Sequence, residues 1–169
     1  LIALGFLVIS ISPIIAVDME TKAFQLIFSS KYGKRDYIQK KAALCIIFAV
    51  ISFIMVEVPY IWQIYNDYGF EGLTADIQNI RGFEEFSVKI PVVTVILLIG
   101  TVKLLGLIIS AIVMMIISYF SKRRLTAYIV NTCLFILPVT LYSVGFNAAL
   151  YAGTTPFIFI NKVIGSLCI

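Results

Sequence analysis

The sequence predicts an all-α integral membrane protein, a polytopic helix bundle with a short amphipathic coupling-like helix on its cytosolic side. Three observations predict this class: the composition, the long apolar stretches and the charged segment between the first two of them. Of the 169 residues, 61% are hydrophobic, against roughly 45 to 50% in soluble domains. A soluble core of this length cannot bury that much apolar surface.

The apolar stretches divide the chain into spans of a single transmembrane domain. A helix needs about 20 residues to cross the hydrocarbon at about 1.5 Å per residue. The predicted spans are residues 1–17, 42–65, 91–120 and 125–146, with a partial or re-entrant span at 151–169. Both ends of the chain fall inside apolar runs, so we expect a fragment of a longer membrane protein.

The distribution of basic residues predicts how these spans are oriented. Segment 18–41 carries six Lys and Arg residues, and 121–124 carries three within four residues. Segment 66–90 carries two, against five acidic residues. Short loops rich in Lys and Arg stay on the cytosolic side, so 18–41 and 121–124 are expected to be cytosolic and 66–90 external. The expected location is the cell membrane, with several crossings, and the basic residues do not indicate nucleic acid.

The cytosolic segment 18–41 has a helical pattern of its own. Asp18 can cap a helix N-terminus, and Gly33 suits the left-handed conformation that ends one. Asp36 and Gln39 resemble a capping box that opens the next span. The apolar residues between these signals recur on one helical face, and they are Ala23, Phe24, Ile27 and Phe28. The segment therefore predicts helix, turn, helix.

Two roles for the amphipathic helix are equally consistent with this spacing. It can lie on lipid, because nearby basic residues would meet anionic head groups; these are Lys31, Lys34, Arg35, Lys40 and Lys41. Alternatively, its apolar face can dock on a protein partner.

A family resemblance is carried by residues 18–35, which read DMETKAFQLIFSSKYGKR, and by Lys40. They resemble the cytosolic segment of bacterial type-two ABC exporter permeases, with a Glu, an apolar stretch, a Ser-containing turn, a basic residue and a Lys entering the next span. Later features are also similar: a polar external loop containing Gln78, an apolar span ending in Ser118, a basic turn, and a span broken by Pro138.

The resemblance implies a coupling helix that docks on a separate ABC nucleotide-binding subunit, which would hold ATP and Mg²⁺. Glu20 would make polar contacts there, Phe24 and Ile27 would fill a groove, and Arg35 would anchor the end of the segment. A second permease subunit, identical or different, and membrane lipid would be the other partners. Lys22 and Ala23 depart from the family, since many members have Gly there.

Lys103 is a charge near the middle of the third predicted span, where insertion costs roughly 2.5 to 3.5 kcal/mol. One interpretation is that it faces a translocation path or pairs with Glu57, toward the outer end of the second span. The other is that residues 91–102 are partly interfacial and that Lys103 snorkels from a span starting near Leu104.

Catalytic, cofactor and metal sites are not indicated by the residue types. The chain has no His, no HExxH, no P-loop motif, and no Ser or Cys beside a plausible base. Cys45, Cys133 and Cys168 lie in apolar stretches and are expected to be packing residues. The leading interpretation is therefore a non-enzymatic permease subunit; the alternatives are an ion-coupled secondary transporter and a non-transporting membrane sensor or immunity protein.

Overall fold

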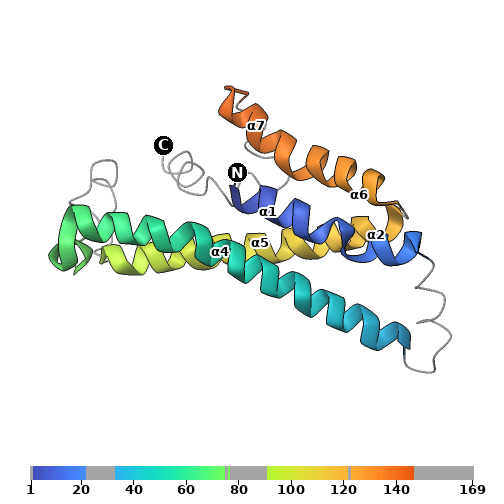
Figure 1. The fold of residues 1–169 in the computed structure, drawn as a ribbon. Helices are drawn as coiled ribbons and strands as arrows, with labels where there is room; N and C mark the ends of the chain where they lie inside the picture. The colour runs from blue at the N-terminus through green and yellow to red at the C-terminus, as the bar shows by residue number, and fades with distance from the viewer. Residues whose placement is uncertain (1, 22–32, 75, 77–90, 122, 147–169) are drawn as a thin grey trace.

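The computed structural model describes residues 2–21, 33–74, 76, 91–121 and 123–146. These residues form helices, in the order shown in Figure 1, and none of them belongs to a strand. The elements are α1 (Ile2–Ile11), α2 (Pro13–Glu20), α4 (Gly33–Thr74), α5 (Val92–Ser121), α6 (Arg124–Asn131), the π-helical turn η2 (Thr132–Ile136) and α7 (Leu137–Ser143). Asp76 and Pro91 form an isolated bridge.

The prediction of an all-helical fold is confirmed for the described residues. Four helices are long and apolar enough to cross a membrane: Ile2–Glu20, Arg35–Asn66, Val92–Ser121 and Arg124–Ser143. The third coincides with its predicted span to within one residue at each end. The predicted partial span 151–169 and most of the predicted external loop lie outside the described residues.

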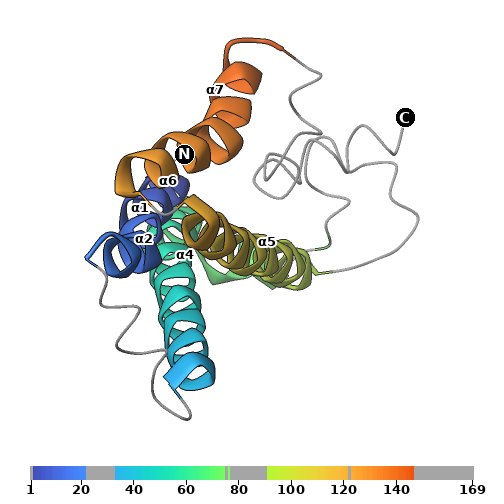
Figure 2. The same cartoon turned by 90° about the vertical axis from the view of Figure 1, so that its right-hand side faces the viewer.

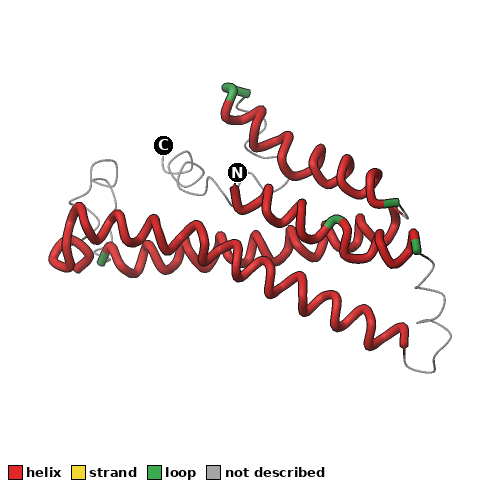
Figure 3. The backbone as a smooth tube through the Cα atoms, viewed as in Figure 1, coloured by secondary structure: helices red, strands yellow, loops and turns green. Residues whose placement is uncertain are grey.

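The first of these helices is interrupted at Ser12, with Pro13 opening α2. The continuous course of the tube in Figure 3 shows that α1 and α2 together cross the bundle as one bent element. The prediction that Asp18 caps the start of a helix is wrong, because Asp18 lies inside the last turn of α2. A short acidic side chain near the end of an apolar run suits a helix start, but here the helix continues to Glu20.

The long helix α4 begins earlier than predicted and ends later. It starts at Gly33, which therefore begins a helix where the sequence predicted that it would end one. The predicted capping box is also wrong, since Asp36 already lies in the first turn of α4. At its far end the helix passes Pro59 and continues beyond the predicted span, until the non-helical conformation of Gly69 (φ 65°, ψ −174°) breaks it.

Helices α4 and α5 form an antiparallel hairpin that extends beyond the rest of the bundle (Figure 1). In Figures 1 and 2 the N-terminal part of α4 diverges from α5; α1 packs against both helices, and α2 packs against α5.

The last candidate span contains a π-helical turn, η2, between α6 and α7. Pro138 lies two residues after its end, and a proline lacks the N–H that would continue the α-helical ladder. The predicted break at Pro138 thus takes the form of one wide turn. The helix ends at Ser143, three residues before the predicted end, and Gly145 follows with φ 110°.

The core is built around α1. Its buried residues are Leu4, Leu7, Val8 and Ile11. Buried with them are Cys45 and Ala49 on α4, Ala111 and Met114 on α5, and Phe135 and Val139 on the last span, three of which are Cys or Ala. Small residues let helix backbones approach closely, so α1 is the element on which the other three candidate spans converge.

Candidate functional site

Four of the six residues that sequence reasoning assigned to a site are described by the structure. Glu20 ends α2, Arg35 is exposed in the first turn of α4, and Glu57 and Lys103 lie on α4 and α5. Phe24 and Ile27, and with them the predicted coupling helix, lie outside the described residues. Among the described residues there are three ion pairs between helices: Glu20–Arg124, Asp18–Lys41 and Glu57–Lys103.

Glu20 already has a partner within the chain. Arg124 Nε donates to Glu20 Oε2 at 2.7 Å, joining the end of α2 to the start of α6. Both side chains are about half exposed, so water and salt weaken the pair. Sequence reasoning gave Glu20 to a partner protein; the structure shows that a partner would have to compete with Arg124 or bind both residues together.

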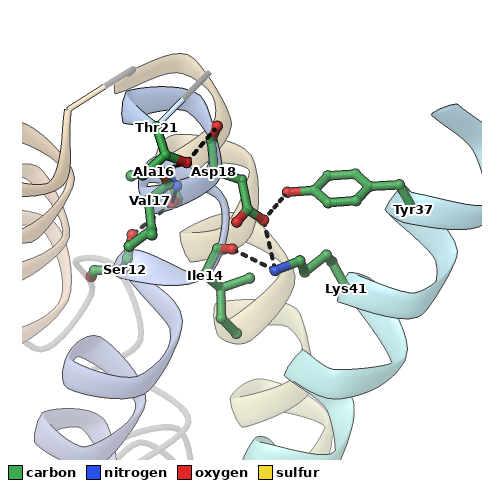
Figure 4. A network of polar contacts seen from close by, with 9 residues as sticks. Ser12, Ile14, Ala16, Val17, Asp18, Thr21, Tyr37 and Lys41 are labelled. Carbon is green, nitrogen blue, oxygen red and sulfur yellow. Dashed lines mark hydrogen bonds and ion pairs between the residues drawn. The ribbon is translucent and has the colours of Figure 1, made fainter. Parts of the chain in front are cut away.

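A second polar site joins α2 to α4 (Figure 4). Asp18 Oδ2 accepts a hydrogen bond from Tyr37 Oη at 2.6 Å and forms an ion pair with Lys41 Nζ at 2.9 Å. Lys41 Nζ also donates to the carbonyl oxygen of Ile14 at 2.8 Å. One carboxylate and one backbone carbonyl of α2 are thereby held by a single face of α4.

Sequence reasoning missed this second site. The available signal was the spacing of Tyr37 and Lys41, because residues four apart share a helical face. The sequence prediction already placed both residues on the helix opened by Asp36, but it gave Asp18 the role of capping a helix of its own and so did not assign it as their partner.

The structure brings Lys103 and Glu57 together. Lys103 Nζ lies 2.8 Å from Glu57 Oε1, and both side chains are mostly buried, at 22% and 12% exposed. Tyr60, one turn after Glu57, places its ring 5.6 Å from Lys103 Nζ, within the range of a cation–π interaction. The pair therefore satisfies the charge of Lys103 inside an otherwise apolar helix hairpin.

The length of α5 bears on both sequence interpretations of Lys103. Helix α5 is continuous from Val92 to Ser121, so residues 92–102 are helical and belong to the same element as Lys103. Lys103 lies eighteen residues before Ser121, about 27 Å along the axis. Since the hydrocarbon is about 30 Å thick, a helix entering at Ser121 places Lys103 close to the opposite boundary.

No protein family, no curated protein and no solved structure matches this chain. Within the described residues, no three His, Cys, Asp or Glu side chains are grouped as metal ligands. The geometry offers instead charged contacts between helices, which fix the helices relative to one another.

Proposed function

We propose that this chain is part of a membrane-embedded permease subunit of an ATP-driven exporter, and that it receives its drive from a separate nucleotide-binding subunit. In this proposal the four apolar helices cross the cell membrane, residues 18–41 and 121–124 face the cytosol, and segment 22–32 forms the docking element.

One observation carries the proposal: the chain is attached to the bundle on both sides of segment 22–32. Before it, Asp18 and Glu20 connect α2 to α4 and α6. After it, Tyr37 and Lys41 connect the start of α4 back to α2. A force applied to the segment would therefore act on three candidate spans together, which is what coupling to an ATPase partner requires.

The outer surface of the bundle supports a membrane location. Many large apolar side chains are exposed on all four candidate spans, among them Ile9 (67%), Met55 (65%), Leu97 (63%) and Ile129 (59%). Large contiguous apolar surface is unfavourable in water and favourable against lipid chains.

The test is affinity purification of the complete protein from its native membrane in mild detergent. The wild type is compared with a double variant, Phe24→Asp with Ile27→Asp, which places two charges on the predicted apolar face. The matched control is Gln25→Asp with Ser29→Asp, which adds the same charges to the opposite face of the same segment. We expect a nucleotide-binding subunit to copurify with the wild type and the control and to be lost from the first variant. If no such subunit accompanies the wild type, the proposal fails.

An ion-coupled secondary transporter is the second candidate, and the buried Lys103–Glu57 pair favours it. Carboxylates and lysines inside membrane spans are costly and often serve in ion pathways. The two candidates are separated by measuring transport of an amphipathic fluorescent cation into inverted membrane vesicles, where an exporter produces uptake. The secondary transporter predicts proton-driven dye uptake without ATP that Glu57→Gln abolishes, whereas the permease predicts uptake only with ATP.

A further inference from the structure

A buried polar cluster surrounds the break in the first candidate span, at Ser12 and Pro13. Ser12 and two polar residues from other helices, Ser118 on α5 and Asn131 on α6, are fully buried there. By residue count Ser12 lies near the middle of the helix pair Ile2–Glu20. Polar groups at such a depth must satisfy one another, because neither water nor lipid chains can do so.

Pro13 leaves one backbone carbonyl of α1 without its helical partner. It has no N–H to donate to the carbonyl of Ile9, four residues earlier, so that oxygen loses its α-helical partner. Tyr128 on α6 supplies a replacement, since its Oη donates to the Ile9 oxygen at 3.2 Å. A side chain of the fourth candidate span thus donates the hydrogen bond that the proline of the first span cannot donate.

Ser118 bridges a step of the same helical ladder three residues further along. Its Oγ donates to the carbonyl of Ser12 at 2.6 Å and accepts from the N–H of Ala16 at 3.2 Å. These two backbone groups are four residues apart, so they are the pair that an uninterrupted α-helix joins directly. The hydroxyl lies between them, and insertion of a side chain into the ladder is a known cause of a helix kink.

Asn131 completes the cluster and leaves one atom unpaired. Its Nδ2 donates to Ser12 Oγ at 2.9 Å, whereas Oδ1 is buried with no hydrogen-bond partner among the described residues. A buried acceptor without a donor is costly. Asn131 is also followed at once by the π-helical turn η2, so both helices that meet here are irregular at the point of contact.

We propose that Ser12–Pro13 is a hinge whose angle is set by Ser118, Tyr128 and Asn131. The Asn131 amide can hold Ser12 in two ways: through Nδ2, as observed, or through Oδ1 accepting from the Ser12 hydroxyl. A shift of α5 or α6 exchanges or withdraws these contacts and so redirects α1 relative to α2. The hinge is independent of the transport proposal, because it rests only on contacts between described helices.

The hinge is tested by pulsed electron paramagnetic resonance on the complete protein in lipid nanodiscs, with its native cysteines replaced by alanine. One nitroxide pair joins Ile2 and Met55, which are 82% and 65% exposed and report the position of α1. A second pair joins Thr21 and Phe120, beyond the hinge, and reports the position of α2. Distances are compared between the wild type and Ser118→Ala.

Removing the Ser118 hydroxyl lets the Ala16 N–H bond directly to the Ser12 carbonyl, so we expect α1 to swing. A ten-residue helix turning through about 20° moves its far end by about 5 Å. The Ile2–Met55 distance should shift by about that amount, while the Thr21–Phe120 distance stays constant. Ser110→Ala is the matched control, since Ser110 is equally buried on α5 but bonds within its own helix, to Gly106.

Three results would overturn the hinge. The first is an unchanged Ile2–Met55 distance in Ser118→Ala, which would assign the bend to Pro13 alone. The second is an equal shift in Ser110→Ala, and the third is an equal shift of both label pairs. If Ser118→Ala does not fold, Tyr128→Phe removes one oxygen from the same cluster; a smaller shift of the Ile2–Met55 pair supports the hinge, and no shift refutes it.

Discussion

Lys103 and Glu57 show how two charges depend on each other once they are taken out of water. Removing one partner leaves the other buried and unpaired, which costs about 3 kcal/mol or more, whereas replacing both by neutral groups costs little. We therefore expect Lys103→Met alone to lower the free energy of unfolding by about 3 kcal/mol. The double variant Lys103→Met with Glu57→Gln should recover most of that loss.

The measurement is an SDS titration of the protein in mixed micelles, followed by circular dichroism. The exposed pair Glu20–Arg124 provides the control: Arg124→Met should change the midpoint much less, because both of its groups are half exposed. Equal losses in the single and double variants at Lys103 and Glu57 would mean that the two charges are not coupled.

Tyr37 is the second residue with a measurable role, because its hydroxyl bonds to an ionised carboxylate, Asp18. Hydrogen bonds to charged groups contribute about 1.5 to 3 kcal/mol. Tyr37→Phe should therefore destabilise the protein by about 1.5 kcal/mol and speed amide hydrogen exchange at the start of α4. Tyr60→Phe on the same helix keeps its ring beside Lys103 and should leave both quantities unchanged; faster exchange there as well would argue against a local role for Tyr37.

At this scale the sequence predicted part of the polar chemistry. It named the Lys103–Glu57 contact as one of two alternatives, because two isolated opposite charges in apolar helices have few other partners. It misplaced Asp18, because the preference of Asp for helix starts does not tell whether a helix has already begun. The contacts of Asp18 with Tyr37 and Lys41 depend on how α2 lies against α4, which the spacing of residues does not give.

The packing of whole helices makes separate predictions about two glycines. A Cβ on Gly100 of α5 would meet only Phe53 Cζ, at an ordinary 3.6 Å, so Gly100→Ala should fit between α5 and α4. Because glycine is less favourable than alanine inside a helix, this variant should gain about 0.5 kcal/mol. Gly145 ends the last helix at φ 110°, so Gly145→Ala should instead lose about 1 kcal/mol. The measurement is the SDS titration midpoint of each variant. Midpoints of Gly100→Ala and Gly145→Ala that both rise or both fall would contradict the different roles given to the two glycines.

The elements themselves were largely predictable from the sequence, since long apolar runs leave few alternatives to a helix. The irregular points within them were not. The polar groups around the break at Ser12 are bonded by Ser118 and Tyr128, which lie more than a hundred residues away along the chain. The π-helical turn after Asn131 has no distinctive composition, and only Pro138 indicated that this helix would depart from regular geometry.

For the molecule as a whole, the proposed topology can be tested by accessibility. With native cysteines replaced by alanine, a cysteine at Asn66 should react in intact cells with a membrane-impermeant maleimide. A cysteine at Thr21, at the opposite end of the bundle, should react only after the membrane is opened. Both positions are exposed in the structure, so burial does not account for a lack of reaction. The reverse pattern would invert the orientation derived from the Lys and Arg counts.

The unequal lengths of the helices would have a consequence for a bilayer around them. The first and last candidate spans contain 19 and 20 residues, whereas those of α4 and α5 contain 32 and 30. In axial length these are about 30 Å for the short pair and about 45 Å or more for the long pair. If these helices cross a bilayer as proposed, a hydrocarbon layer of about 30 Å matches the first pair only. The α4–α5 hairpin would then extend beyond the hydrocarbon, tilt, or gather a thicker annulus of lipid on its own side. The acyl-chain length of the lipids would then change the tilt of the hairpin. It would also change the depth in the bilayer at which Lys103 and Glu57 meet.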